Sequence, residues 1–284
     1  MQAPIPTARY PRVLSIAGSD SGAAAGVGAG VQADLKTFAA LGCFGMTAIT
    51  ALTAQNTTGV RSIHAVPLQI LADQIDAVVE DIGADAVKIG MLHSAPTVQA
   101  VADAIDRHQL RQVVLDPVMV ATSGATLIDP QAVASLVREL FPRTALVTPN
   151  LDEAALLVDR PLHSEADMEA AARELLARGA NAVLLKGGHL DGDTVSDLLL
   201  EKGDYPLWMR APRIATANTH GTGCTLSSAI AAHLALGADL PQAVRQAREF
   251  VRGALQAGAT VRTGTGSGPL NHGHAPQPMR LLPL

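Results

Sequence analysis

Short apolar runs and longer amphipathic stretches alternate along most of this chain. The apolar runs are rich in β-branched residues and lack polar alternation, which is typical of strands buried on both faces. They read RVLSIAG at 12–18, AVKIG at 86–90, QVVLDP at 112–117, ALVTP at 145–149 and AVLLKGG at 182–188. Between them, segments such as 68–82 and 166–179 have the apolar spacing of helices. The alternation predicts a three-layer α/β fold, in which a doubly wound, mostly parallel sheet carries helices on both faces.

No linker composition interrupts this pattern before about residue 262. We therefore predict a single α/β domain over 1–262 and an irregular C-terminal tail over 263–284, where Gly and Pro are frequent. The tail carries His272 and His274. Without other ligands nearby in the sequence, we expect these two side chains to be solvated rather than bound to a metal.

Composition narrows the classes of function. Aromatic residues make up 2% of the 284 residues, and the net charge is −5. Both values argue against a nucleic-acid surface, which needs basic charge and stacking rings. The two cysteines, Cys43 and Cys224, form no disulfide framework and fit a reducing compartment. No apolar run approaches the length of a membrane span, so we predict a cytoplasmic protein with no membrane partner.

Polar or conformationally special residues end several of the predicted strands. In doubly wound sheets, ligands bind at the carboxyl ends of the strands. The residues at these ends are Gly18, Gly90, Met91, Asp116, Asn150 and Lys186. We therefore expect one ligand site at this edge of the sheet.

The segment HGTGCTLSSAIAAHLAL places two glycines and a cysteine directly before a helical run. Gly221 and Gly223 let backbone N–H groups turn toward one point, and the helix adds the positive end of its dipole. This combination suits a phosphate. The alternative is an ordinary loop in which Thr222 caps the helix and Cys224 is a small buried residue.

Three charged residues at or shortly after strand ends have both a chemical and an ordinary interpretation. Asp116 can hold Mg²⁺ or form an Asp-Pro turn. Glu153 can position water bound to magnesium, or it can pair with Asn150 in a capping box. Lys186, with two glycines behind it, can neutralise phosphate charge or be solvated.

Two further segments bear on ligand binding. The glycines at 26, 28 and 30 lack the G-x-G-x-x-G spacing of a dinucleotide site. Asp34 follows on the next predicted helix and faces either the same pocket or solvent. In ITALTAQNT, an apolar stretch ends at Gln55, whose amide can donate and accept at once, which suits the edge of a heterocycle.

Taken in order, GVQADLKTFAALG, ITALTAQNT, KIGML, TPNLDEAALL, KGGHL and NTHGTGCTLSSAIAA resemble one family over about residues 12–275. This family is the hydroxymethylpyrimidine/phosphomethylpyrimidine kinases of thiamine biosynthesis, within the ribokinase-like superfamily. The resemblance implies an aminopyrimidine pocket lined by Gly18, Asp34, Gln55, Met91 and Val118. It implies a Mg–ATP site served by Asp116, Glu153 and Asn150, with Lys186, Thr219, Thr222 and the 221–224 loop near the phosphates.

The resemblance also gives Cys224 a role. Sugar kinases of the superfamily carry aspartate there as the base, whereas this family carries cysteine. We expect Cys224 to take the hydroxyl proton, with its thiolate favoured by the helix N-terminus. The first loop departs from the family pattern, since GSDSGAAAGVGAGVQAD is about four residues longer than G[TS]DPSGGAGIQAD and lacks its proline.

The sequence therefore predicts a Mg²⁺–ATP-dependent kinase that phosphorylates 4-amino-5-hydroxymethyl-2-methylpyrimidine and then its monophosphate. Pyridoxal or pyridoxine kinase is the alternative within the superfamily, because that ring also carries a hydroxymethyl group. An NAD(P)-dependent oxidoreductase and a non-catalytic pyrimidine-binding relative are alternatives of other classes. We expect small-molecule partners only and leave a homodimer open.

Overall fold

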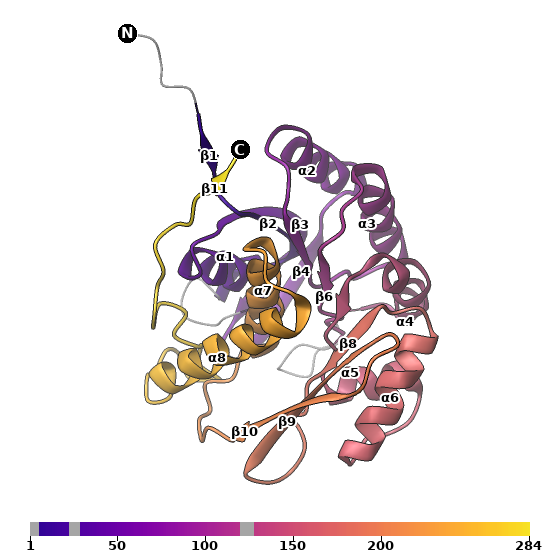
Figure 1. Cartoon of the computed structure of the whole chain (residues 1–284), viewed down its shortest axis with the longest axis vertical. Coiled ribbons are helices and arrows are strands. Elements are labelled where there is room, and N and C mark those ends of the chain that lie inside the picture. The colour runs from indigo at the N-terminus through magenta and orange to yellow at the C-terminus, as the bar shows by residue number, and fades with distance from the viewer. Residues whose placement is uncertain (1–5, 23–28, 120–127) are drawn as a thin grey trace.

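A central mixed sheet of nine strands organises the fold, in the order β10-β9-β8-β7-β6-β5-β2-β3-β4 (Figure 1). The computed structural model describes residues 6–22, 29–119 and 128–284. Its inner strands β8, β7, β6, β5, β2 and β3 run parallel to one another, and β4, β9 and β10 pair antiparallel at the two edges. The strands are β2 (Arg12–Asp20), β3 (Phe44–Asn56), β4 (Gly59–Ala65), β5 (Ala86–Ile89), β6 (Val113–Leu115), β7 (Leu146–Val147), β8 (Ala182–Leu185), β9 (Thr194–Glu201) and β10 (Leu207–Pro212).

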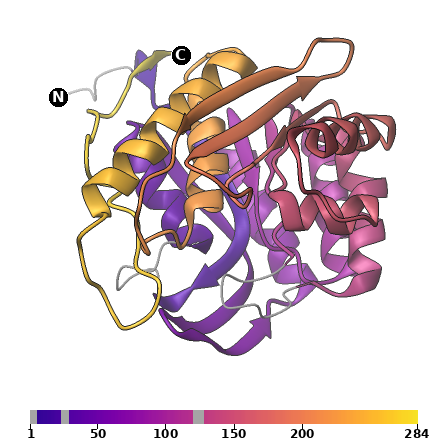
Figure 2. The ribbon, with the colours of Figure 1, turned by 90° about the horizontal axis from the view of Figure 1, so that it is seen from below.

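Helices cover both faces of the sheet (Figures 1 and 2). One face packs against α1 (Gly30–Ala40), α7 (Thr222–Ala235) and α8 (Leu240–Gly258). The other packs against α2 (Leu68–Asp81), α3 (Ala95–His108), α4 (Pro130–Ser135), α5 (Leu151–Val158) and α6 (Glu165–Ala177), and α4 continues into the helical turns Leu136–Leu140 and Phe141–Arg143. Each face buries its own apolar core, so the predicted three-layer α/β fold is confirmed.

Local sequence signals explain where several helices begin. Ser94 accepts a hydrogen bond from the Thr97 N–H at the start of α3, and Asp239 accepts one from the Gln242 N–H at the start of α8. Such caps satisfy backbone donors that have no partner within the helix. The predicted helices at 68–82 and 166–179 appear as α2 and α6.

The order of the strands reverses at β2, and this reversal places the ligand site. β2 pairs with β3 on one side and with β5 on the other. After β3 and β4 the chain crosses to β5 and then continues outward through β6, β7 and β8. Such a switch point leaves a crevice at the carboxyl ends of the adjacent strands.

The C-terminal residues contact the rest of the chain at several points, although they contain little regular structure and most residues beyond 274 are exposed. Arg280 N–H donates to Gly42 O, and β11 (Leu282–Pro283) pairs with β1 (Ala8–Arg9) in a small separate sheet. β1 and β11 therefore lie side by side in Figure 1. His272 is 6% exposed, so the expectation that it is solvated is wrong. The tail packs along α7 and α8, which sequence spacing does not reveal.

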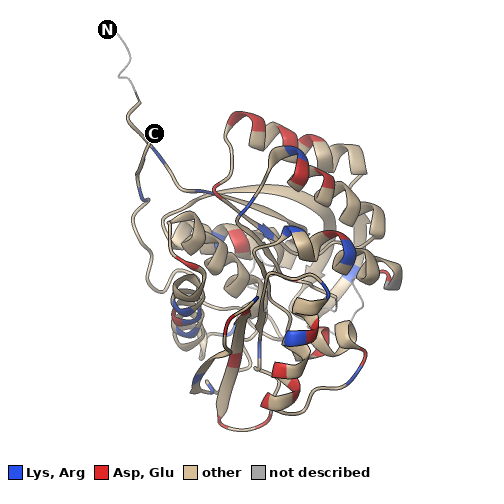
Figure 3. Cartoon of the chain, turned by 45° about the vertical axis from the view of Figure 1, so that its right-hand side comes forward, with Lys and Arg blue, Asp and Glu red and all other residues tan. Residues whose placement is uncertain are grey.

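The charge distribution and the character of the helices bear on which partners the chain can have. Acidic and basic positions are interspersed along the helices drawn in Figure 3. Among the described helices, none combines the length and the apolar character needed to cross a membrane.

Candidate active site

Two cavities open at the carboxyl edge of the sheet. The larger has a volume of about 680 Å³ and the smaller about 160 Å³. Five residues line both cavities, and these form the shared wall: Asn150, Glu153, Lys186, Gly221 and Gly223. Two ligands held in the two cavities would therefore meet at the shared wall.

The small cavity collects residues that the sequence places at strand ends. Gly18 comes from β2, Met91 follows β5, and Val118 follows β6. Gln55, near the end of β3, also lines the cavity, and the Thr53 hydroxyl donates to its Oε1 at 3.3 Å. A side chain at Gly18 would come within 2.7 Å of Met91 Cε, so the cavity needs glycine there.

Asp34 lies behind the small cavity rather than on its wall. Its carboxylate is fully buried and is paired with Lys88, whose Nζ lies 3.0 Å from each Asp34 oxygen. Ser15 and Ser228 also donate to the carboxylate, at 2.5 and 2.6 Å. The helical position that the sequence suggested for ligand binding is thus occupied by an internal ion pair. Lys88, which lines the small cavity, was not anticipated, although a lysine within the apolar run AVKIG is a readable signal.

The anion loop, residues 219–224, leads into the first turn of α7, and the Thr222 N–H donates to the Thr219 carbonyl at 3.3 Å. Gly221 is the N-cap residue, with a φ of 80°, and no side chain caps the helix. The Thr222 hydroxyl donates instead to the Thr219 carbonyl at 2.6 Å, so Thr222 is not the cap. A Cβ at Gly223 would lie 3.2 Å from Lys186 Nζ. Glycine at this position therefore keeps the space beside Lys186 open for a ligand. This geometry presents N–H groups and the helix dipole to an anion.

A lysine between two carboxyl groups dominates the electrostatics of the shared wall. Lys186 Nζ lies 2.9 Å from Asp116 Oδ1 and 4.0 Å from Glu153 Oε2. Burial acts to raise the pKa of Asp116, but the Lys186 and Lys88 ammonium groups outweigh it and lower that pKa. Burial, assisted by Asp116, raises the pKa of Glu153 to about 7. One lysine thus fails to neutralise both carboxyl groups.

This surplus of carboxylate fits a magnesium ion. Oxygen ligands are those that Mg²⁺ prefers, and it commonly binds through one or two carboxylates plus phosphate oxygens. Glu153 also forms the capping box with Asn150, through N–H to side-chain oxygen bonds of 2.8 and 2.9 Å. The cap and the cavity position are compatible, because Glu153 lines both cavities from the first turn of α5.

Cys224 borders the small cavity in the first turn of α7. Burial raises the pKa of its thiol to about 11, despite the opposing charge of Lys88 and a hydrogen bond from the backbone of Gly30. The expectation of a favoured thiolate is therefore wrong for the free protein. Desolvation and the nearby carboxylates outweigh the helix N-terminus.

The large cavity has features that the sequence did not disclose. Asp197 on β9 accepts a hydrogen bond from the Gly187 N–H at 2.9 Å and another from Arg248 Nε at 2.8 Å. This pair fixes the turn that follows Lys186. The apolar part of the cavity is lined by Ile214, Leu226, Val251 and Leu255. Thr219 and Thr222 complete the rim on the side of the anion loop.

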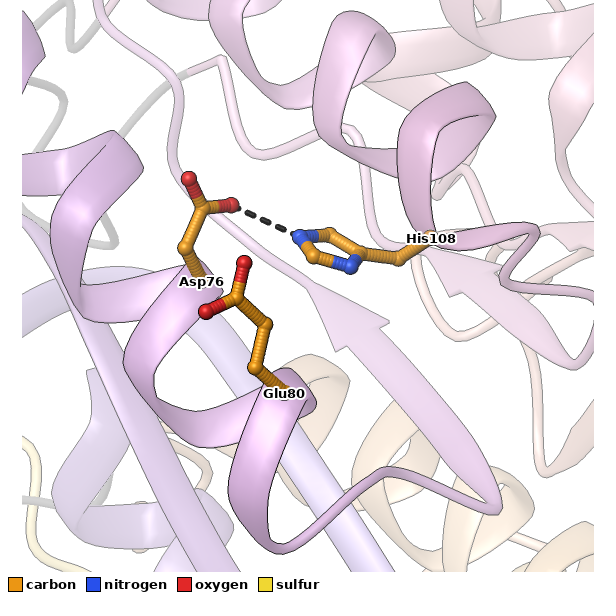
Figure 4. A group of neighbouring side chains, drawn as sticks. All are labelled: Asp76, Glu80 and His108. Carbon is orange, nitrogen blue, oxygen red and sulfur yellow. Dashed lines mark hydrogen bonds and ion pairs between the residues drawn. The ribbon is translucent and has the colours of Figure 1, made fainter.

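A separate group of metal-ligating side chains lies between α2 and α3. Asp76, Glu80 and His108 place their ligand atoms within 4.8 Å of one another (Figure 4). The Asp76 carboxylate already accepts hydrogen bonds from Arg107 and His108, at 2.5 and 2.7 Å. These contacts account for the group as an ion pair between two helices.

The extended glycine loop at 20–30 falls largely on residues 23–28, which lie outside the described residues.

Known proteins have sequences that align with most of this chain. A sequence model described as phosphomethylpyrimidine kinase matches residues 24–271. The hydroxymethylpyrimidine/phosphomethylpyrimidine kinase of Rhizobium meliloti (strain 1021) is 51% identical over 262 residues, covering 92% of this chain and 96% of that protein. The enzyme of the same name from Escherichia coli (strain K12) is 47% identical, covering 92% and 97%.

Solved structures give the same fold. An ADP complex of Bacillus subtilis pyridoxal kinase matches with a TM-score of 0.85 and 34% identity, covering 93% of this chain and 98% of that chain. A phosphomethylpyrimidine kinase from Clostridium difficile 630 matches with a TM-score of 0.75 and 40% identity, covering 86% and 99%. The fold and the paired cavities define a small-molecule kinase with the ribokinase-like fold. Within that class, the chain belongs to the phosphomethylpyrimidine kinase family.

Proposed function

We propose that the chain phosphorylates 4-amino-5-hydroxymethyl-2-methylpyrimidine with ATP, and then phosphorylates the monophosphate to the diphosphate, in thiamine diphosphate biosynthesis. The observation that carries the proposal is the shared wall between the two cavities. The nucleotide occupies the large cavity and the pyrimidine the small one. The transferred phosphoryl group then passes between them at Lys186 and the anion loop.

Phosphoryl transfer asks a protein mainly for alignment and for stabilisation of charge. The N–H groups at Gly221 and Gly223 bind the transferred group, and Lys186 offsets its charge. Asp116 and Glu153 would hold Mg²⁺, which offsets charge on the nucleotide phosphates when bound. Asn150, Thr219 and Thr222 position the nucleotide, and an apolar wall receives its base.

The substrate side of the reaction uses the small cavity. Gln55 reads the ring edge, and Gly18, Met91 and Val118 enclose the ring. In the first step, the hydroxymethyl oxygen forms a bond to the γ-phosphorus while the bond to ADP breaks. The hydroxyl proton passes to Cys224 in its thiolate form. In the second step, a phosphate oxygen of the monophosphate is the acceptor.

Pyridoxal kinase is the second candidate, because a pyridoxal kinase matches the fold with a TM-score of 0.85. Identity favours the pyrimidine kinases, at 51% against 34%. ADP release measured with the aminopyrimidine alcohol, pyridoxal and pyridoxine as separate substrates tests the choice. We expect the highest kcat/KM with the pyrimidine, and a higher value with pyridoxal would overturn the proposal. We also propose that the protein acts in the cytoplasm.

A further inference from the structure

The C-terminal segment 264–274 runs along the anion loop and contacts the residues at both of its ends. The backbone of Pro269 pairs with that of His220 in a parallel bridge. A methyl group at Gly268 would overlap the amide of Asn218, so the segment lies directly against this side chain. The Asn218 amide in turn donates to the carbonyls of Gly258 and Val261, both at 2.7 Å. The residues that precede Gly221 are thus held by the C-terminal part of the chain.

His272 makes the contact on the other side of the anion loop. Its Nε2 lies 2.9 Å from the hydroxyl of Thr225, the residue that follows Cys224. Thr225 is fully buried and His272 is 6% exposed. The ring also hydrogen-bonds the backbone of Leu270, and burial lowers the pKa of His272 to about 4. The ring is therefore neutral at physiological pH. We assign the ring proton to Nδ1, which leaves Nε2 to accept the hydrogen bond that Thr225 donates.

The segment is itself anchored, which a positioning role requires. The Asn271 N–H donates to the Ala254 carbonyl on α8 at 3.0 Å. The Gly266 N–H donates to Thr57 Oγ1 at 3.3 Å, in the turn between β3 and β4. Gln55 lies near the end of β3, just before this turn. The segment 264–274 therefore contacts both the anion loop and the turn that follows Gln55.

We propose that His272 is a positioning residue for phosphoryl transfer, which holds the first turn of α7 through Thr225 and so fixes the N–H groups of the anion loop. This inference rests on the proposed phosphate-binding role of that loop. A displacement of about 1 Å in catalytic geometry commonly costs about 10²-fold in rate. Without its acceptor, the buried Thr225 hydroxyl would be left unsatisfied. The hydroxyl would then rotate toward another partner, or the first turn of α7 would shift to provide one.

The test compares His272→Phe, which keeps a ring but removes the acceptor, with His272→Gln, which supplies an acceptor. The matched control is His274→Ala. His274 belongs to the same segment but packs against Phe250 on α8, away from the anion loop. Thr225→Val is the second variant, and it removes the same hydrogen bond from the other side.

For His272→Phe and Thr225→Val, we expect kcat to fall about 10-fold or more and KM for ATP to rise by a similar factor. KM for the pyrimidine alcohol should change much less. We expect His272→Gln to recover most of the rate, and His274→Ala to lower the melting temperature without changing either constant. Values for His272→Phe and Thr225→Val that match the His274→Ala control would overturn the inference.

Gly223→Ala separates this inference from the role of the loop itself. If Gly223→Ala weakens ATP binding while His272→Phe does not, the loop binds phosphate but His272 does not position it. If Gly223→Ala leaves ATP binding unchanged, the phosphate-binding role falls, and the inference falls with it.

Discussion

The thiol of Cys224 is protonated at neutral pH in the free protein, because burial raises its pKa to about 11. At that pKa, only a small fraction of the molecules carries the thiolate at pH 7. A base of this kind matters when the acceptor is an alcohol, whose proton must leave. It matters far less when the acceptor is a phosphate monoester, which is already an anion above its second pKa of about 6.

We therefore predict that Cys224→Ala separates the two steps. Phosphorylation of the alcohol should slow by about 10²–10⁴-fold, the usual contribution of a positioned base. Phosphorylation of the monophosphate should lose much less. In the unmodified protein, the alcohol step should accelerate by about tenfold per pH unit between pH 7 and 9, because the thiolate fraction rises as pH approaches the pKa.

ADP release with each substrate, measured across this pH range, checks both statements. Cys43→Ala is the control, since Cys43 is buried and lines neither cavity. Equal losses on the two substrates, or a normal alcohol rate, would show that Cys224 is not the base.

The ion pair between Lys88 and Asp34 gives a prediction about stability. Lys88→Met leaves the fully buried Asp34 carboxylate without its cation. Breaking one partner of a buried pair typically costs about 3–5 kcal/mol in the free energy of unfolding. The double variant Lys88→Met with Asp34→Asn should recover much of this loss. Urea denaturation of the unmodified protein, the two single variants and the double variant measures it, and additive losses would refute the pairing.

At the scale of single elements, the capping box of α5 and the proposed metal site share Glu153. Glu153→Gln keeps an N3 side chain that can complete the box, but it removes the charge. We predict a higher Mg²⁺ concentration at half-maximal rate with little change in melting temperature. Ser164→Ala is the control, because Ser164 caps α6 by accepting the Asp167 N–H. Ser164→Ala should lower the melting temperature and leave the magnesium dependence unchanged. If Glu153→Gln behaves in the same way, the role of Glu153 is capping alone.

The contact between α2 and α3 predicts a dependence of stability on pH. Hydrogen bonds from His108 and Arg107 lower the pKa of Asp76 in the folded protein. A lowered pKa stabilises the fold above the unfolded pKa of about 3.9, and this contribution disappears as pH falls through the folded value. Asp76→Asn should thus cost about 0.2–1 kcal/mol at pH 7, as exposed ion pairs do, and less as the pH falls below about 3.9. Melting curves at pH 7 and at successively lower pH values test this, and a loss that does not shrink on acidification would contradict it.

For the whole molecule, local sequence predicts the parallel strands but not the edges of the sheet. Strands β2, β5, β6, β7 and β8 are apolar runs, because helices bury both of their faces. The edge strand β4 is mostly exposed, and its sequence GVRSIHA carries no comparable signal. The apolar stretch that ends at Gln55 marks only part of β3, and the sequence pattern does not predict the antiparallel hairpins.

For the site too, local sequence predicts some residues and misses those that depend on distant packing. Strand ends converge by topology, so Gly18, Asp116 and Lys186 could be placed together in advance. The burial of Asp34 could not be predicted, because it depends on Lys88 and Ser228, which are 54 and 194 residues away in sequence. The pKa of Cys224 and the contact of His272 with Thr225 likewise depend on how distant segments pack.

The central claim is that one site performs two successive phosphorylations. The most direct measurement is the number of ADP molecules released per molecule of aminopyrimidine alcohol when ATP is in excess and the reaction runs to completion. We predict two, with the pyrimidine diphosphate as the final product by mass spectrometry and the monophosphate appearing transiently. Release of one ADP, with the monophosphate persisting, would contradict the second step, and no release above the ATP-only background would contradict the proposed function altogether.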